Sequence, residues 1–293
     1  MLRTRLIVGA MLAALTVGML LVDQRFAPWF PFLFGTMAFL SVVGTLELLA
    51  LLPEATRPNR VLALAGVLAL IVLAWGKIIG IRYSLKFSAG LEMNAATWVF
   101  HGFAALILIA FVFEMATFRS GGHALIRLAL TIWLFAYLGL LPTFLAMLRT
   151  NLNEWTADAI HRGTAMLALA IFVPKACDIG AYFTGRALGR HKMAPALSPG
   201  KTWEGAAGGL IAAVAAAFGI DALGAVIPGS GFQIAAFGLT VGGAGMLGDL
   251  AESMIKRDCE RKDASDNVPG FGGVLDVVDS ILFAAPAAYW WLA

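Results

Sequence analysis

The chain has 293 residues, of which 60% are hydrophobic and only 13% are charged. Soluble domains carry about 25% charged residues, so this composition excludes an ordinary soluble domain and indicates a polytopic membrane protein. The formal net charge of +3 is small and the basic residues form no stripe, which argues against a nucleic-acid partner. We expect an all-α bundle, because helices satisfy their own backbone hydrogen bonds in lipid and strand-like alternation is absent.

Nine apolar stretches predict the membrane-spanning helices of this bundle. The first follows two arginines and has the look of a signal peptide, but no Ala-x-Ala-like cleavage site follows it, so we expect a retained span. The seventh is short and rich in alanine and glycine. In chain order, the predicted spans are 6–22, 30–52, 61–80, 96–118, 125–147, 164–184, 205–220, 232–251 and 275–292.

The basic residues predict how these helices are oriented. With a cytoplasmic N-terminus, fourteen of the 21 Lys and Arg residues fall in cytoplasmic segments and six in outer segments, while Lys175 lies within a span. Cytoplasmic loops are enriched in Lys and Arg, so this bias predicts the N-terminus inside and the C-terminus outside. The charged motifs would then share the cytoplasmic face of the inner membrane. Cys177 and Cys259 would lie near that face and stay reduced.

A shift in composition divides the chain into two parts. Residues 1–160 consist of bulky apolar spans with scattered charges, whereas 161–293 contain most of the patterned polar residues. We interpret the first part as a transmembrane scaffold and the second as the catalytic half of one integral membrane unit. Small-residue pairs in the second part, such as Gly205 and Gly209, would let helices approach closely.

Lys175 and Asp178 are the first polar residues that the pattern singles out. They stand three residues apart inside the sixth predicted span, so they share a helix face and are expected to form an ion pair. Such a pair makes each charge tolerable in lipid, and it is also typical of the wall of a polar cavity.

The loop after the sixth span contains a Gly-Lys-Thr run that ends at Thr202. We reject a P-loop, because Pro195 stands where that motif requires glycine and no strand is expected before it. Ser198, which a proline follows, is typical of a helix N-cap. The N-terminus of that helix, with Lys201 and Thr202, is a candidate anion site.

The strongest signal lies in the last fifth of the chain. Asp249, Ser253 and Lys256 recur at i, i+4 and i+7, so they share one face of a helix. Asp276 and Asp279 stand at the start of the ninth span, and the glycine-rich run before them has a backbone able to approach a phosphate closely. Carboxylates on facing helix ends beside lysines predict a site for Mg²⁺ and a phosphorylated substrate.

These residues resemble the phosphatidate cytidylyltransferase family, also called CDP-diacylglycerol synthases. The family signature Ser-x-x-Lys-Arg, then Lys-Asp, then Pro-Gly-His-Gly-Gly-x-x-Asp-Arg-x-Asp is matched over 253–279. A second family block is matched over 178–205, and the whole resemblance covers about 174–286. Two positions depart from the pattern: Phe271 stands at the family's histidine and Val277 at its second arginine.

The resemblance implies that CTP and phosphatidate react to give CDP-diacylglycerol and pyrophosphate. It implies Mg²⁺, alone or with a second cation, held by Asp249 and Asp276, with Ser253, Lys256 and Asp279 completing the catalytic residues. The expected partners are CTP, phosphatidate, membrane lipids and, since family members are commonly dimers, a second copy of the chain. The residues expected to contact substrate are Asp178, Ser198, Lys201, Thr202, Arg257, Lys262, Gly272 and Gly273.

Several alternatives remain at this level. A CDP-alcohol phosphotransferase would need an Asp-Gly-x-x-Ala-Arg run, which is missing from the sequence. A CTP-dependent enzyme for another lipid phosphate stays open, and so does an inactive bundle, because Phe271 and Val277 depart from the family pattern. A transporter would place Lys175 and Asp178 at a midplane site between paired repeats, and no such repeat is visible.

Overall fold

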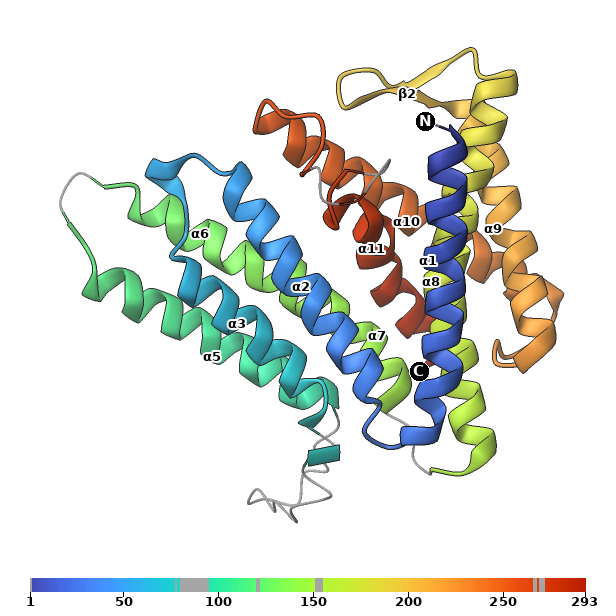
Figure 1. Cartoon of the computed structure of the whole chain (residues 1–293), viewed down its shortest axis with the longest axis horizontal. Helices are drawn as coiled ribbons and strands as arrows, with labels where there is room; N and C mark the ends of the chain where they lie inside the picture. Colours follow the sequence, from blue (N-terminus) through green and yellow to red (C-terminus); the bar gives the residue numbers. More distant parts are fainter. Residues whose placement is uncertain are drawn as a thin grey trace.

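The structure, a computed structural model, describes residues 2–76, 78–79, 95–119, 122–150, 155–265, 268 and 272–293. Long helices dominate the described part of the chain (Figure 1). They are α1 (Leu2–Asp23), α2 (Pro31–Leu51), α3 (Arg60–Leu73), α5 (Ala95–Ala116), α6 (Ala124–Leu134), the π-helical η3 (Phe135–Leu140), α7 (Leu141–Thr150), α8 (Ala157–Leu188), α9 (Trp203–Gly224), α10 (Gly231–Asp258) and α11 (Leu275–Leu292). Two short 3-10 turns, η1 (Gln24–Phe26) and η2 (Glu54–Thr56), follow α1 and α2.

The helices form two groups with a central pair between them (Figure 1). Helices α2, α3, α5, α6 and α7 pack together on one side, whereas α8 and α9 pack together with α1 on the other. The central pair, α10 and α11, contacts α8 and α9 on one flank and α2 and α7 on the other. Helices from both ends of the sequence therefore meet at α10 and α11.

The expected all-α membrane bundle is confirmed. Among the described residues, eight helices are long and apolar enough to cross a membrane, and α6, η3 and α7 together form one of them. The third predicted span, 61–80, contains the 14-residue helix α3, which at about 1.5 Å per residue is shorter than the roughly 30 Å hydrocarbon layer. Part of that span lies outside the described residues. The third span, the total of nine spans and the orientation therefore stay predictions.

A two-stranded hairpin interrupts the helices between α8 and α9. Strand β1 (Lys192–Ala194) pairs antiparallel with β2 (Ser198–Thr202). The Glu204 carboxylate fastens the hairpin to α9, because it accepts hydrogen bonds from the backbone N–H groups of Arg190 at 3.1 Å and His191 at 3.2 Å. The hairpin and the start of α1 lie at the same end of the bundle (Figure 1).

The prediction that Ser198 caps a helix is wrong. Ser198 begins β2, and α9 starts only at Trp203. The N-cap is Thr202, which has extended backbone angles and accepts a hydrogen bond from the Gly205 N–H at 3.1 Å. The strand pairing of Ser198 with Ala194 keeps its backbone extended, so the helix can begin only where the hairpin ends.

Glycines let α8 and α9 approach each other closely. A Cβ atom at Gly209 would lie 2.7 Å from the Cys177 carbonyl oxygen, and one at Gly205 would lie 2.9 Å from the Ala181 carbonyl oxygen. Real Cβ atoms avoid such distances, so only glycine permits this contact. The predicted packing role of these two glycines is confirmed.

Candidate active site

A cluster of charged side chains lies where α8, α10 and α11 meet, beside the β1–β2 hairpin. We call it the acid–lysine cluster, and its members are Lys175, Asp178, Lys201, Asp249, Glu252, Lys256, Asp276 and Asp279. Small residues bring the helices together there. A Cβ at Gly248 would lie 2.5 Å from the Asp279 carbonyl oxygen, and one at Gly245 would lie 2.6 Å from Cβ of Pro174.

Three carboxylates form the centre of this cluster. Asp249 and Glu252 on α10 and Asp279 on α11 each offer an oxygen, and these oxygens lie within 4.8 Å of one another. Glu252 and Asp279 are buried, and Oε1 of Glu252 has no hydrogen-bond partner among the described residues. Buried like charges this close repel unless a cation or protons neutralise them. An all-oxygen donor set of this kind fits a hard cation such as Mg²⁺.

Three lysines surround the carboxylates. Lys256 is buried and pairs with Glu252 at 2.7 Å and with Asp276, and Lys201 from β2 lies 2.9 Å from Asp249. Lys175 lies 3.2 Å from Asp178, which confirms the predicted pair, and 3.5 Å from Asp279. Five carboxylates against three ammonium groups leave a formal charge of −2 when all are ionised. The cluster as a whole therefore favours an added cation.

Asp276 is held by the glycine-rich turn and by Lys256. Its Oδ2 accepts hydrogen bonds from the N–H groups of Gly273 at 2.7 Å and Ala264 at 3.2 Å. Gly272 has φ +108°, a conformation that side chains disfavour, and a Cβ there would lie 2.8 Å from Asp276 Oδ2. The structure thus connects Asp276 to Asp249 through Lys256 and Glu252, and it brings Glu252 and Asp279, rather than Asp276, directly beside Asp249.

Glu47 of α2 reaches this region from the other part of the chain. The carboxylate is buried and accepts hydrogen bonds from the N–H groups of Val274 at 3.0 Å and Leu275 at 2.9 Å. It also accepts a hydrogen bond from the Ser265 hydroxyl at 2.6 Å. Negative charge at a helix N-terminus is stabilising, so Glu47 anchors the start of α11, on which Asp276 and Asp279 lie.

The sequence analysis did not single out Glu47 or Glu252. Each nevertheless carried a signal. Glu47 is an ionisable residue in the middle of an apolar span, which is a functional candidate by default. Glu252 stands three residues after Asp249, and such spacing places two side chains on one helix face.

The remaining predicted residues lie around the cluster or on the hairpin side of it. Asp178 accepts a hydrogen bond from the Ser280 hydroxyl at 2.8 Å, and Ser253 is half-buried on α10. Arg257 ties α10 to the hairpin, since its Nε donates to the Leu197 carbonyl oxygen at 3.3 Å. Lys262 is exposed and lines a cavity of about 380 Å³ with Arg261 and five other residues.

Four positions that the sequence analysis singled out lie away from the centre of the cluster or outside the described residues. The Thr202 hydroxyl is engaged as the cap of α9, and Ser198 belongs to β2. Val277 is half-buried in the first turn of α11, whereas Phe271 lies outside the described residues.

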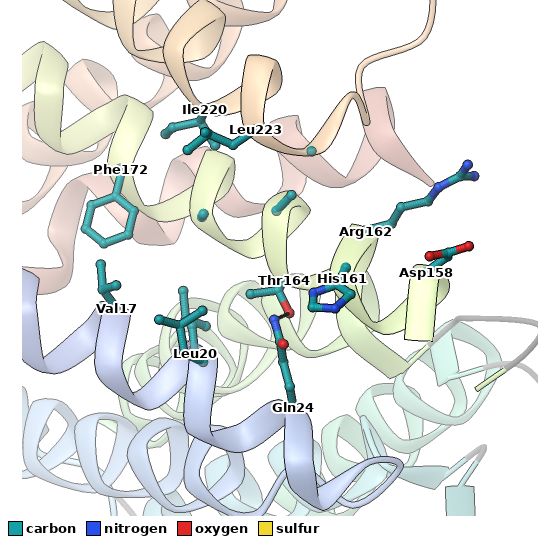
Figure 2. Close-up of a pocket in the computed structure, with 14 residues that line it drawn as sticks. Val17, Leu20, Gln24, Asp158, His161, Arg162, Thr164, Phe172, Ile220 and Leu223 are labelled. Carbon is teal, nitrogen blue, oxygen red and sulfur yellow. Dashed lines mark hydrogen bonds between the residues drawn. The ribbon is translucent and has the colours of Figure 1, made fainter. Parts of the chain in front are cut away.

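A second cavity lies beside the N-terminal half of α8. Figure 2 shows its walls, which come from α1, α8 and the end of α9 and enclose about 660 Å³. Gln24 donates a hydrogen bond to Thr164 at 2.8 Å across it. Its lining on α8 runs from Asp158 to Phe172, and Phe172 stands three residues before Lys175, about 4.5 Å along a helix. None of the residues that line this cavity belongs to the acid–lysine cluster.

Comparison with known proteins places the chain in a family. The model of the cytidylyltransferase family matches residues 3–293. A phosphatidate cytidylyltransferase of Bacillus subtilis is 34% identical over 236 residues, 80% of each chain. One of Haemophilus influenzae is 40% identical over 201 residues, 67% of this chain and 66% of the relative, and one of Brucella suis is 48% identical over 112 residues, 38% of this chain and 41% of the relative. The chain belongs to the cytidylyltransferase family.

Proposed function

We propose that this chain is a membrane-bound phosphatidate cytidylyltransferase, which makes CDP-diacylglycerol and pyrophosphate from CTP and phosphatidate. The observation that carries the proposal is the acid–lysine cluster, in which three carboxylates lie within 4.8 Å of one another beside three lysines. The names of the Bacillus and Haemophilus relatives support the choice of phosphatidate as the lipid acceptor.

The reaction needs charge control rather than a strong base. A phosphatidate oxygen attacks the α-phosphorus of CTP, a new P–O bond forms, and the bond to the β-phosphate breaks to release pyrophosphate. The phosphate monoester is largely ionised near pH 7, because its second pKa is about 6. Catalysis of such transfers is mostly positioning and electrostatic stabilisation. We assign Lys201 and Lys256, with the nearby Arg257 and Ser253, to the phosphates of CTP.

We propose that Asp249, Glu252 and Asp279 hold Mg²⁺. Asp276, the second ligand that the sequence predicts, supports this set through its ion pair with Lys256. The bound ion would neutralise charge on the triphosphate and on the leaving pyrophosphate. The chain's own contribution is to keep three carboxylates together in a buried site, which the lysines and the glycine-mediated helix contacts allow.

The activity is tested by measuring pyrophosphate release from the detergent-solubilised, purified chain. We expect release only when CTP, phosphatidate and Mg²⁺ are all present, and we expect CDP-diacylglycerol to appear in equal amount. Replacing phosphatidate by other lipid phosphates separates the proposed acceptor from an alternative one. Failure to release pyrophosphate with any lipid phosphate, under conditions where the Bacillus relative is active, would overturn the proposal.

We also propose that the acid–lysine cluster faces the cytoplasm in the inner membrane. The argument is the excess of Lys and Arg in the segments at that end of the bundle. Membrane lipids and a second copy of the chain are the further proposed partners. Light scattering of the chain in detergent micelles tests the dimer, since a monomer has a protein mass of 31.0 kDa.

Cys259 provides a native reporter of orientation. It is half-buried directly after α10, whereas Cys177 is buried inside α8. We expect a membrane-impermeant maleimide to label Cys259 in inverted vesicles and not in spheroplasts. Burial and the adjacent Asp258 raise the pKa of the Cys259 thiol. Because the thiolate is the nucleophile, labelling should be slow near pH 7 and accelerate as the pH rises.

The Cys259→Ser variant is the control, because it should remove the label and leave Cys177 unlabelled. Labelling in intact spheroplasts instead would reverse the proposed orientation. Labelling that is independent of pH would contradict the raised pKa.

A further inference from the structure

Tyr137 has a hydroxyl group that the fold leaves without a partner. Its side chain is only 5% exposed, and its hydroxyl forms no hydrogen bond to any residue that the structure describes. Buried polar groups are nearly always paired, because an unpaired one loses its hydrogen bonds to water and gains none. The exceptions in native proteins require a reason, and an incomplete site is one such reason.

The backbone around Tyr137 is also unusual. It lies in η3, a π-helical turn inside an otherwise α-helical span. Such turns are rare and occur frequently at functional sites, because they shift the direction of the side chains that they carry. This turn belongs to the part of the chain that the sequence identifies only as scaffold.

Aromatic contacts fix the ring of Tyr137 in place. It stacks on Trp133, with centroids 5.4 Å apart and planes at 11°, and it meets Phe283 of α11 edge-on at 6.3 Å. Phe283 stands one helical turn after Asp279, so the ring packs against the helix that carries one of the three central carboxylates. A ring held on two sides keeps its hydroxyl in one position.

The hydroxyl of Tyr137 interacts electrostatically with Asp279, Glu252 and Asp249, yet it forms a hydrogen bond with none of them. Oε1 of Glu252 also has no hydrogen-bond partner among the described residues. The Tyr137 hydroxyl and Oε1 of Glu252 are thus two buried polar atoms without a hydrogen-bond partner among the described residues, and Phe283 links the Tyr137 ring to the helix of Asp279. A phenol can donate one hydrogen bond and accept others, so an oxygen brought to this centre would give it a partner.

We propose that Tyr137 is a positioning residue of the active site, whose hydroxyl donates a hydrogen bond to an oxygen brought there by a ligand. That oxygen belongs either to a water on the bound cation or to a phosphate of CTP. The inference rests on the proposed function only for the identity of the ligand. The site would then include a residue from outside the family motifs described above.

The test is Tyr137→Phe, which removes one oxygen and keeps the ring. Without ligand, we expect a melting temperature equal to or above that of wild type, because the variant loses no hydrogen bond to a described residue and no longer buries an unpaired hydroxyl. We expect kcat/KM for pyrophosphate release to fall about 10-fold, the factor that corresponds to one hydrogen bond of about 1.4 kcal/mol. Tyr289→Phe is the matched control, because Tyr289 contacts Phe144 elsewhere in the bundle, and it should keep wild-type kinetics.

Thermal shifts identify the oxygen and do not depend on turnover. If Tyr137 positions a cation-bound water, the stabilisation by Mg²⁺ alone should be smaller in Tyr137→Phe than in wild type. If it positions a phosphate, only the further stabilisation by CTP should be smaller. If the wild-type chain releases no pyrophosphate but Tyr137→Phe still reduces the thermal shifts, the inference is retained and the proposed reaction is rejected.

Two results would overturn the role of Tyr137. One is a variant with wild-type kcat, KM and thermal shifts. The other is a variant with a lower melting temperature in the absence of ligand but unchanged kinetics, which would make the hydroxyl purely structural.

Discussion

Asp249→Asn is expected to lower the rate of pyrophosphate release by at least about 100-fold, the usual effect of removing one preorganised electrostatic group. Asp249 contributes an oxygen to the three-carboxylate centre and also pairs with Lys201 of the hairpin at 2.9 Å. An amide in its place would bind a cation more weakly and would release Lys201. The measurement is steady-state pyrophosphate release at increasing Mg²⁺ concentrations, together with the Mg²⁺-induced thermal shift.

Two further variants test which carboxylates hold the metal. The structure groups Glu252 and Asp279 with Asp249, whereas the sequence predicts Asp276 with Asp249. Glu252→Gln should raise the Mg²⁺ concentration needed for half-maximal activity, because Glu252 lies beside Asp249. Asp276→Asn should lower the maximal rate with a smaller change in Mg²⁺ requirement, because Asp276 holds the turn and Lys256. Asp258→Asn, an exposed carboxylate on the same helix, is the control. A larger change in Mg²⁺ requirement in Asp276→Asn than in Glu252→Gln would instead favour Asp249 and Asp276 as the metal ligands.

Glu47→Ala is expected to destabilise the protein and to abolish activity without touching the proposed ligands. The substitution leaves the N–H groups of Val274 and Leu275 and the Ser265 hydroxyl without this acceptor. A buried donor left unpaired costs about 1–3 kcal/mol in the free energy of unfolding. The start of α11 would lose its anchor, and Asp276 and Asp279 would shift with it. Thermal unfolding followed by tryptophan fluorescence, alongside the pyrophosphate assay, measures both effects.

Glu54→Ala provides the matched control for Glu47. Glu54 follows in the exposed turn η2, so its removal should change neither the melting temperature nor the activity. Glu47→Gln is the finer test, because it keeps an acceptor oxygen but replaces the other by an amide that cannot accept. We expect an intermediate melting temperature. Wild-type stability in Glu47→Ala would show that α11 does not depend on this carboxylate.

Patterns that depend on neighbouring residues could be predicted from the sequence. The apolar stretches gave the helices, because span length and hydropathy are local properties. The Lys175–Asp178 pair follows from helical spacing, and the packing of Gly205 and Gly209 follows from the absence of a side chain. Helical spacing placed Asp249 on one face with Lys256, and the family signature includes Lys256 and Asp279. The structure brings these three residues into one cluster.

Contacts between distant segments could not be predicted in this way. Glu47 meets α11 across more than two hundred residues, and no spacing rule connects them. Tyr137 depends on a π-helical turn that hydropathy does not reveal. The cap of α9 was misassigned because Ser198 before a proline favours a helix start locally, whereas pairing with β1 keeps the segment extended. In each case a tertiary contact decided between locally acceptable structures.

The anchoring of α11 by Glu47 also limits how this protein can be divided or redesigned. A fragment that starts at residue 161 would retain the family signature but would lack the carboxylate that holds the first turn of α11. It would also lack the aromatic side chain that packs on Phe283. Transplanting the motif-bearing helices into another membrane scaffold would therefore carry the chemical groups without their alignment. The smallest engineering unit for this site includes α2 and η3 as well as the C-terminal helices.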